Sequence, residues 1–208
     1  MNPIIFLDID GVLNNDIFFK DRYLMIKSGE WEKICPPMED KEYWEKYCEE
    51  RGVPYDIFAT KKKTYVREGF YYPYHHEVQE FDPKCIKVLN DFIEKVGADI
   101  VISSSWRFSG LEWLKTLFKL VGIKGNVIDI TPRIYKEPDE DFDERGCEIQ
   151  EWISRNKCEA PYVIFDDDSD MTEFQKEHTF VRTNNTYGLT QKDTERAEEL
   201  LKKQTNNN

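Results

Sequence analysis

Short, unbroken runs of apolar residues recur along the chain, separated by segments in which apolar residues repeat at helical spacing. Such runs are typical of parallel strands that are covered on both faces of a sheet. The three strongest runs each stop at acidic or hydroxyl residues, and two others are weaker. The strong runs predict strands over 3–7, 99–102 and 162–165, and the weaker ones over 126–130 and 179–181.

Helix signals fill the gaps between the predicted strands. Asp82 followed by Pro83 is typical of a helix N-cap and first turn, and the apolar pattern after it predicts a helix that stops near Gly97. Thr190, with an aspartate three residues later, indicates a capping box at the start of a last helix that runs to about residue 203. The other predicted helices cover 39–51, 109–121 and 145–156.

This alternation of strands and helices predicts an α/β fold: a Rossmann-like three-layer core with a mostly parallel sheet. Residues 15–80 interrupt the alternation and are rich in aromatic residues, so they are interpreted as a cap or flap inserted after the first strand and folded over one end of the sheet. The core then consists of residues 1–14 and 81–203. The polar residues 204–208 are expected to form a flexible tail.

The amino-acid composition argues against several classes of function. Among 208 residues, 29 lysines and arginines face 41 aspartates and glutamates, a formal net charge of −12. This balance argues against a protein that coats duplex DNA, which needs a basic surface. No stretch approaches the roughly 20 apolar residues of a membrane span. The five cysteines are scattered without a CxxC pair, as expected of free thiols in a reducing cytoplasm, so we expect a cytoplasmic protein.

The polar residues that end the strong strands carry the candidate chemistry. In open α/β sheets, ligands bind outside the carboxyl ends of the strands. Asp8 and Asp10 follow the first strand, a serine such as Ser104 the second, and Asp166 and Asp167 the third. Four carboxylates at one edge would repel each other without a cation, and their hard oxygens favour Mg²⁺. The sequence therefore predicts a magnesium site built from these four aspartates, next to a site for phosphate.

Three segments also resemble a known family. Residues 6–14 read FLDIDGVLN, residues 101–107 read VISSSWR, and residues 163–170 read VIFDDDSD. They resemble, in the same order along the chain, the first, second and fourth motifs of the haloacid dehalogenase (HAD) superfamily. Four runs resemble, more narrowly, a bacterial and phage branch of this superfamily: SSSWR at 103–107, the helix start Arg145-Gly146-x-Glu148-Ile149, DDDSDM at 166–171 and Gly188-Leu189-Thr190. That branch is related to the HAD domains of RNA-repair proteins, whose relatives include polynucleotide kinase-phosphatases. The resemblance covers 3–14 and 81 to about 201.

The resemblance implies a phosphatase that works through an aspartyl-phosphate. Asp8 would be the nucleophile, and Asp10 would protonate the leaving oxygen and later activate water. In the family the backbone carbonyl of the second aspartate ligates the metal. Ser104 would hydrogen-bond the phosphoryl group, since the family register places the hydroxyl two residues before Trp106. Either Asp166 or Asp167 would bind the metal directly, and Asp167 is the first candidate because in the family the second aspartate of such a pair usually binds the metal and the first supports it.

One basic residue is expected to complete this set by neutralising the phosphoryl oxygens. Arg145, at the start of the helix before the last catalytic strand, is the first candidate, with Arg133 and Lys136 as alternatives. Further candidates for substrate binding are Ser105 and Arg107, within the second motif, and Lys62, in the basic triplet of the insertion.

The substrate stays open at this point. The resemblance favours a nucleotide or a single-stranded nucleic-acid end, with nucleic-acid repair as the implied role, whereas the net charge of −12 favours a small phosphorylated metabolite. A Mg²⁺-dependent nuclease and a non-catalytic phosphate-binding module are the alternatives from other classes. Neither a membrane nor an obligate protein partner is implied.

Overall fold

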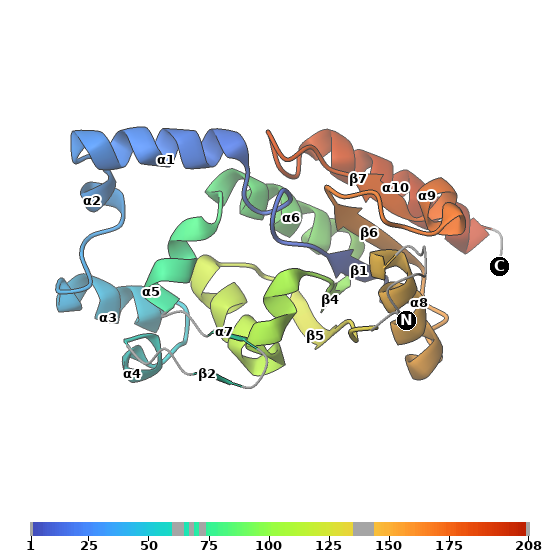
Figure 1. Cartoon of the computed structure of the whole chain (residues 1–208), viewed down its shortest axis with the longest axis horizontal. Coiled ribbons are helices and arrows are strands. Elements are labelled where there is room, and N and C mark those ends of the chain that lie inside the picture. The colour runs from blue at the N-terminus through green and yellow to red at the C-terminus, as the bar shows by residue number, and fades with distance from the viewer. Residues whose placement is uncertain (1, 60–64, 67–68, 71–73, 135–143, 207–208) are drawn as a thin grey trace.

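A parallel sheet of five strands forms the centre of the computed structural model, which describes residues 2–59, 65–66, 69–70, 74–134 and 144–206 (Figure 1). The order of its strands places β1, the first in the chain, in the middle of the sheet. Both neighbours of β1 run parallel to it, which confirms the predicted α/β class. Across the sheet the strands are β5 (Asn126–Ile130), β4 (Asp99–Ile102), β1 (Ile4–Leu7), β6 (Tyr162–Asp166) and β7 (Phe180–Arg182).

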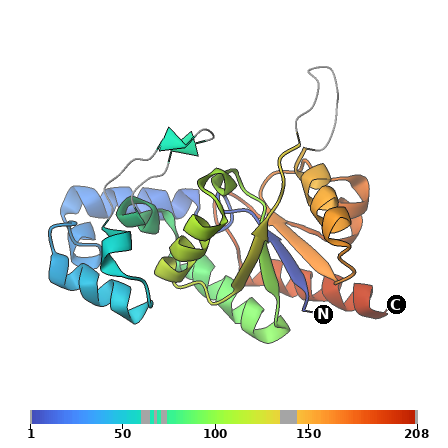
Figure 2. The same cartoon turned by 90° about the horizontal axis from the view of Figure 1, so that it is seen from below.

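Helices cover both faces of this sheet (Figure 2). Successive residues of β1 point to opposite faces, so Ile5 and Leu7 join one apolar core while Ile4 and Phe6 join another. The first core includes residues of α6 (Pro83–Val96), α7 (Leu111–Val121) and α10 (Gln191–Asn206); the second includes residues of α8 (Glu144–Asn156). A sheet covered on both sides explains why its strands are apolar without interruption.

The ends of the elements differ slightly from the sequence prediction. Helix α7 begins at Leu111 rather than at residue 109, because a 3₁₀ turn, η2 (Ser105–Ser109), and Gly110 precede it. Strand β7 begins at Phe180, because the N–H of Thr179 still donates to the carbonyl of Gln175 and closes α9 (Glu173–His178).

The predicted flexible tail from residue 204 is wrong for its first three residues. Helix α10 continues to Asn206. The side chain of Gln204 donates to the carbonyl oxygen of Tyr162 over 2.9 Å and accepts from the Tyr162 N–H over 3.0 Å. These two hydrogen bonds attach the last turn of α10 to the start of β6, and a polar side chain that reaches backbone groups in this way gives no apolar signal in the sequence.

The insertion is mainly helical and lies beside α7 (Figure 1). It contains short helices and a two-stranded antiparallel ribbon. In chain order these are α1 (Asp16–Ser28), α2 (Trp31–Ile34), α3 (Lys41–Glu50), α4 (Tyr55–Phe58), β2 (Tyr65–Val66), β3 (Gly69–Phe70), α5 (Tyr74–Glu77) and the 3₁₀ turn η1 (Val78–Glu80). We call residues 15–80 the cap.

Several of the aromatic residues form the interior of the cap. The rings of Trp44 and Phe58 are fully buried and stack with their centroids 4.9 Å apart. The hydroxyl of Tyr47 donates to the carbonyl oxygen of Leu120 on α7 over 2.6 Å, and the ring of Tyr74 stacks on Trp113 at 5.2 Å. The cap is therefore packed against the core through α7.

The two ends of the cap meet at the core. The N–H of Asp82 donates to the carbonyl oxygen of Leu13 over 2.8 Å, and the side-chain amide of Asn15 donates to the Asp82 carboxylate over 2.8 Å. Asn15 also caps α1, accepting from the N–H of Phe18. A separate observation is that no helix among the described residues has both the length and the apolar character needed to cross a membrane.

Candidate active site

The register of the sheet brings the ends of three strands to one level. Leu7 pairs with Ile102 on β4 and with Phe165 on β6, so the residues that follow, Asp8 and Ser103, come together with Asp166 at the carboxyl edge. The N–H of Asp8 continues the sheet by donating to the Phe165 carbonyl oxygen over 3.0 Å. Asp8 and Asp166 are both buried.

Three carboxylates form a candidate cation site at this edge. Oxygens of Asp8, Asp166 and Asp167 all lie within 4.8 Å of one another. Atom Oδ2 of Asp166 is buried without a hydrogen bond, and its one ion-pair contact is with Nε of Arg145 at 3.4 Å. An all-oxygen set with an unsatisfied buried acceptor fits Mg²⁺ well. The predicted set is thus brought together except for the carboxylate of Asp10, which lies outside this group.

Gly11 lets the loop after β1 approach Asp167 closely. Its φ is +66°, and a Cβ on it would lie 2.4 Å from Cγ of Asp167. The hydroxyl of Thr183 donates to the Gly11 carbonyl oxygen over 3.0 Å and holds the loop from the other side. The glycine of the first motif is therefore required both by its left-handed backbone and by the lack of space.

Asp10 is held by two hydrogen bonds beside this group. Its Oδ2 accepts from the indole N–H of Trp106 over 2.9 Å, and its Oδ1 accepts from the side-chain amide of Asn14 over 2.9 Å. Asn14 in turn accepts from the N–H of Gly11. The carboxylate is exposed. An exposed acid held in a fixed orientation next to a buried one can exchange a proton with a bound molecule.

Of the three consecutive serines, Ser104 is the one that hydrogen-bonds Asp8. Ser103, also buried, accepts a long hydrogen bond of 3.4 Å from the hydroxyl of Thr131 instead. Ser105 is exposed and begins η2. Ser104, the middle serine, is also the one that the sequence register selects.

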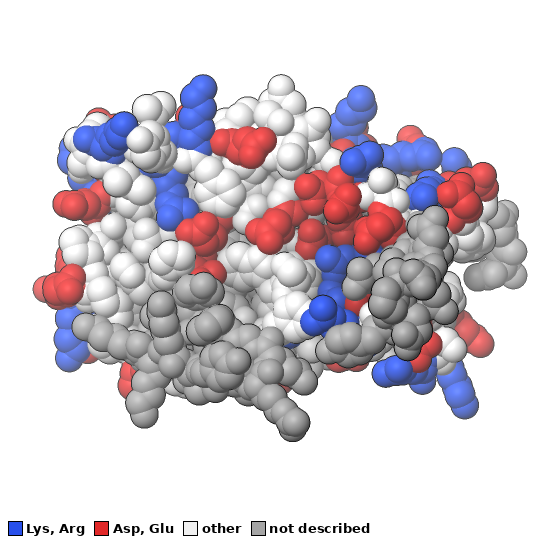
Figure 3. Space-filling view, in the orientation of Figure 1, with Lys and Arg blue, Asp and Glu red and all other residues white. Residues whose placement is uncertain are grey.

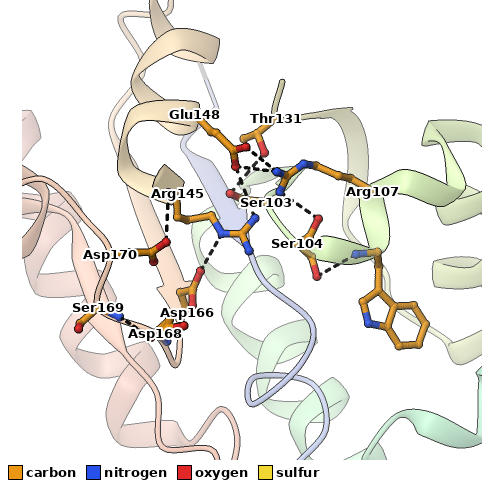
Figure 4. A network of polar contacts seen from close by, with 11 residues as sticks. Ser103, Ser104, Arg107, Thr131, Arg145, Glu148, Asp166, Asp168, Ser169 and Asp170 are labelled. Carbon is orange, nitrogen blue, oxygen red and sulfur yellow. Dashed lines mark hydrogen bonds and ion pairs between the residues drawn. The ribbon is translucent and has the colours of Figure 1, made fainter. Parts of the chain in front are cut away.

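Arg145 links the carboxylates to a second ion pair (Figure 4). Its Nε lies 3.4 Å from Oδ2 of Asp166, and its Nη1 lies 3.7 Å from Oε2 of Glu148. Glu148, buried on the same helix, also accepts two hydrogen bonds of 2.6 and 2.7 Å from Nη2 of Arg107. Asp170 fixes the start of the helix by accepting from the backbone N–H of Arg145 over 3.2 Å.

Of the two basic candidates that the structure describes, Arg133 and Arg145, it is Arg145 that lies against the aspartates. Arg133 lies instead over the ring of Phe108, 4.9 Å from its centroid. Lys136 lies outside the described residues, as does Lys62, so neither prediction is tested. Ser105 and Arg107 line a cavity next to Arg145.

Burial governs the protonation of the two central aspartates. It raises the pKa of Asp8 from 3.8 to about 6, against the opposing charge of Arg145 and the hydrogen bond from Ser104. Burial, followed by the negative charge of Asp8, raises the pKa of Asp166 to about 8. Burial also raises the pKa of Asp167. The group resists holding its full negative charge without a cation.

These shifts predict how the metal-free protein responds to pH. Because the folded-state pKa values of Asp8 and Asp166 lie above the ordinary 3.8, the folded protein binds protons that the unfolded chain releases. Their stabilising contribution is therefore complete below about pH 4 and is lost as the pH rises through 6 and then 8. We expect urea unfolding in EDTA to show stability falling from about pH 5 to about pH 8.5.

Two comparisons make this expectation specific. Asp166→Asn should remove most of the decrease in the free energy of unfolding above about pH 6. Asp168→Asn, which changes an exposed neighbour, should leave that decrease as it is in the unaltered protein. Added Mg²⁺ should raise the stability more at high pH than at low pH, because it replaces the protons. The assignment of this pH dependence to Asp8 and Asp166 would be contradicted if the metal-free unaltered protein became more stable over this pH range and Asp166→Asn showed the same pH dependence.

Several residues of the site were given no catalytic or binding role from the sequence. Glu148 neutralises both Arg107 and Arg145, whereas the sequence shows it only as part of the helix start that follows Arg145. Trp106 and Asn14 orient Asp10. Asn14 lies within the first motif, whereas the indole of Trp106 comes from a segment 96 residues away.

One family model matches this chain in a comparison with known proteins. The family model of the HAD domain in Swiss Army Knife RNA repair proteins matches residues 4–194. Searches of curated proteins and of solved structures each return no significant match. The matched range spans all five strands and the cap.

Proposed function

Because the chain belongs to the family of HAD domains in Swiss Army Knife RNA repair proteins, and is thus a HAD-type hydrolase, we propose that it is a Mg²⁺-dependent phosphomonoester hydrolase that works through an aspartyl-phosphate. The observation that carries this proposal is the convergence of Asp8, Asp166 and Asp167 within 4.8 Å, with Arg145 against them. Bound Mg²⁺ would be held by these carboxylates and would offset their charge and that of the phosphoryl oxygens.

In the first step, a carboxylate oxygen of Asp8 attacks phosphorus and the bond from phosphorus to the ester oxygen breaks. Asp10, protonated and fixed by Trp106 and Asn14, gives its proton to the leaving oxygen, so the alcohol departs neutral. Ser104 and Arg145 donate hydrogen bonds to the phosphoryl oxygens. Their fixed positions supply donors before charge develops.

In the second step, water attacks the phosphorus of the aspartyl-phosphate. Asp10, now a carboxylate, accepts a proton from that water, and the bond between phosphorus and the Asp8 oxygen breaks. Inorganic phosphate leaves and Asp8 returns to its ionised form. The same residue thus acts as acid and then as base.

Nucleotides or nucleic-acid terminal phosphates are the proposed substrates. The family description, which names RNA repair proteins, supports them. A small phosphorylated metabolite is the alternative, favoured by the net charge of −12. A nuclease would also gather carboxylates at strand ends, but it would not need Asp8 as a nucleophile.

Release of inorganic phosphate tests the proposal. The panel holds 3′- and 5′-phosphorylated oligonucleotides, mononucleotides and sugar phosphates, each with Mg²⁺ and with EDTA. We expect release with Mg²⁺ only. Internal cleavage of the oligonucleotides without phosphate release would overturn the proposal in favour of a nuclease, and Mg²⁺-dependent thermal stabilisation without any turnover would favour a binding module.

The hydrogen bond from Trp106 predicts a dependence on the leaving group. Trp106→Phe keeps an aromatic ring against Phe81 but removes the N–H that orients Asp10. We expect kcat/KM to fall about tenfold for an alkyl phosphate, whose leaving oxygen needs a proton, and less than about threefold for p-nitrophenyl phosphate.

Trp113→Phe, at the interface between cap and core, is the matched control and should leave kcat/KM unchanged for both the alkyl phosphate and p-nitrophenyl phosphate. An equal fall for the two substrates in Trp106→Phe would assign Trp106 a structural role only.

A further inference from the structure

A separate cavity of about 190 Å³ lies next to the candidate active site. It has room for several waters or for a small anion with part of its hydration shell. Neither Asp8 nor Ser104 lines it, so it is distinct from the place of the phosphoryl group that is hydrolysed. Its lining residues are Ser105, Arg107, Phe108, Arg133, Arg145, Glu148 and Asp170. We call it the arginine pocket.

The arginine pocket is basic on an acidic protein. Three arginines line it against two carboxylates, although the chain carries a formal net charge of −12. Figure 3 shows basic side chains directly beside the acidic group in the middle of one face of the molecule. A local excess of guanidinium groups next to a phosphatase centre favours a second anion.

Two of these guanidinium groups have N–H donors without acceptors. Arg107 is only 8% exposed, and its Nε is buried with no hydrogen-bond partner although its Nη2 is fully engaged by Glu148. Atom Nη1 of Arg145 is likewise buried without a hydrogen bond. Buried donors without partners are costly, and an anion in the pocket would satisfy them.

The exposed member of the set, Arg133, is held in position over the pocket. Its guanidinium lies 4.9 Å from the ring centroid of Phe108, and that of Arg107 lies 5.7 Å from the same ring. The next residue, Ile134, donates its N–H to Oε1 of Glu148 over 3.4 Å, which ties the segment after β5 to the floor of the pocket. The pocket is therefore pre-formed.

Arg145 joins the pocket to the catalytic carboxylates, with its Nε facing Asp166 and its Nη1 facing Glu148. A second, larger hollow of about 430 Å³ along β5 shares Arg107, Phe108 and Arg133 with the pocket. A ligand extending from Asp8 past Arg145 would thus enter the pocket that Arg133 also lines.

We propose that the arginine pocket is a subsite for a second phosphate of the substrate, in a linkage next to the terminal phosphate that is removed. Guanidinium groups suit this ligand because they are permanently charged and offer forked donors to phosphate oxygens. The subsite rests on the proposed phosphatase function. It would make a phosphodiester-linked substrate bind more tightly than one with a single phosphate.

Binding to a protein that cannot turn over the ligand tests the subsite directly. The probes are two dinucleotides with the same terminal phosphate, one with a phosphodiester linkage and the other with a neutral methylphosphonate linkage. They are titrated calorimetrically, with Mg²⁺, into the Asp8→Asn protein with and without Arg133→Gln. Arg196→Gln, on the exposed surface of α10, is the matched control.

We expect the charged linkage to bind about tenfold more tightly, an advantage that Arg133→Gln removes and Arg196→Gln keeps. The subsite is overturned if both dinucleotides bind equally, if neither binds, or if Arg133→Gln weakens both to the same extent. It is also overturned if Arg133→Gln weakens only the binding of free inorganic phosphate, since the pocket would then hold product. Failure of the phosphatase proposal itself is seen separately, as absence of p-nitrophenyl phosphate turnover by the unaltered protein.

Discussion

Replacing Asp8 by asparagine should reduce phosphate release by at least about 10⁴-fold, because the amide cannot attack phosphorus. The variant should remain folded, since asparagine keeps the shape of the side chain and removes a charge that burial disfavours. The measurements are kcat/KM for the best substrate of the panel and the free energy of unfolding in EDTA at about pH 8, which should not decrease.

Asp168→Asn is the control for this experiment because it removes a charge from the same acidic run at an exposed position. It should keep turnover within about threefold of the unaltered protein. Beryllium fluoride, a phosphate mimic, should raise the melting temperature of the unaltered protein with Mg²⁺ and leave that of Asp8→Asn unchanged. Turnover that survives in Asp8→Asn would show that another group attacks phosphorus.

The second large effect is expected at Gly11. In Gly11→Ala, the new Cβ would lie 2.4 Å from Cγ and 2.5 Å from Oδ2 of Asp167, so the carboxylate must move. Because a displacement of about 1 Å in an active site can cost about 10²-fold in rate, we expect at least that loss of turnover. Thermal stabilisation by Mg²⁺ should weaken as well.

Gly29 provides a matched comparison. It has a similar φ of +74° at the end of α1, but nothing lies within 4 Å of a Cβ placed there. Alanine at either position should cost about 1 kcal/mol for the left-handed backbone. Only Gly11→Ala should lose turnover and metal response. If Gly29→Ala lost turnover to the same extent, backbone strain alone would explain both effects.

The layout of the sheet and of the central aspartates could be predicted because both depend on local signals. An apolar run followed by an acid marks the end of a buried strand, and parallel pairing places such ends at one edge. Pairing of Leu7 with Ile102 and Phe165 is all that is needed to bring Asp8, Ser104 and Asp166 together. The first and fourth motifs therefore indicated the site without any knowledge of the cap.

Contacts between distant side chains could not be predicted in this way. The Arg107–Glu148 pair joins residues 41 apart, and the Trp106–Asp10 hydrogen bond joins residues 96 apart. Neither follows from periodicity. The course of the cap could not be predicted either. Helix α1 has no apolar stripe in its sequence that would fix its packing, and none of its residues is buried in the structure. The role of Gln204 depends in the same way on the distant Tyr162.

The hydrogen bonds that join Leu13 and Asn15 to Asp82 have a consequence for how this protein can change over evolution. They bring the entry and exit points of the cap together, so the path of the core chain is nearly continuous across the insertion. The entropy cost of closing a loop grows only slowly with its length, so this segment can lengthen or shorten, outside its contacts with α7, at little cost to the sheet. Changes in the length or sequence of the cap are therefore a route to new substrate preferences that leaves Asp8, Asp166 and Asp167 in their positions.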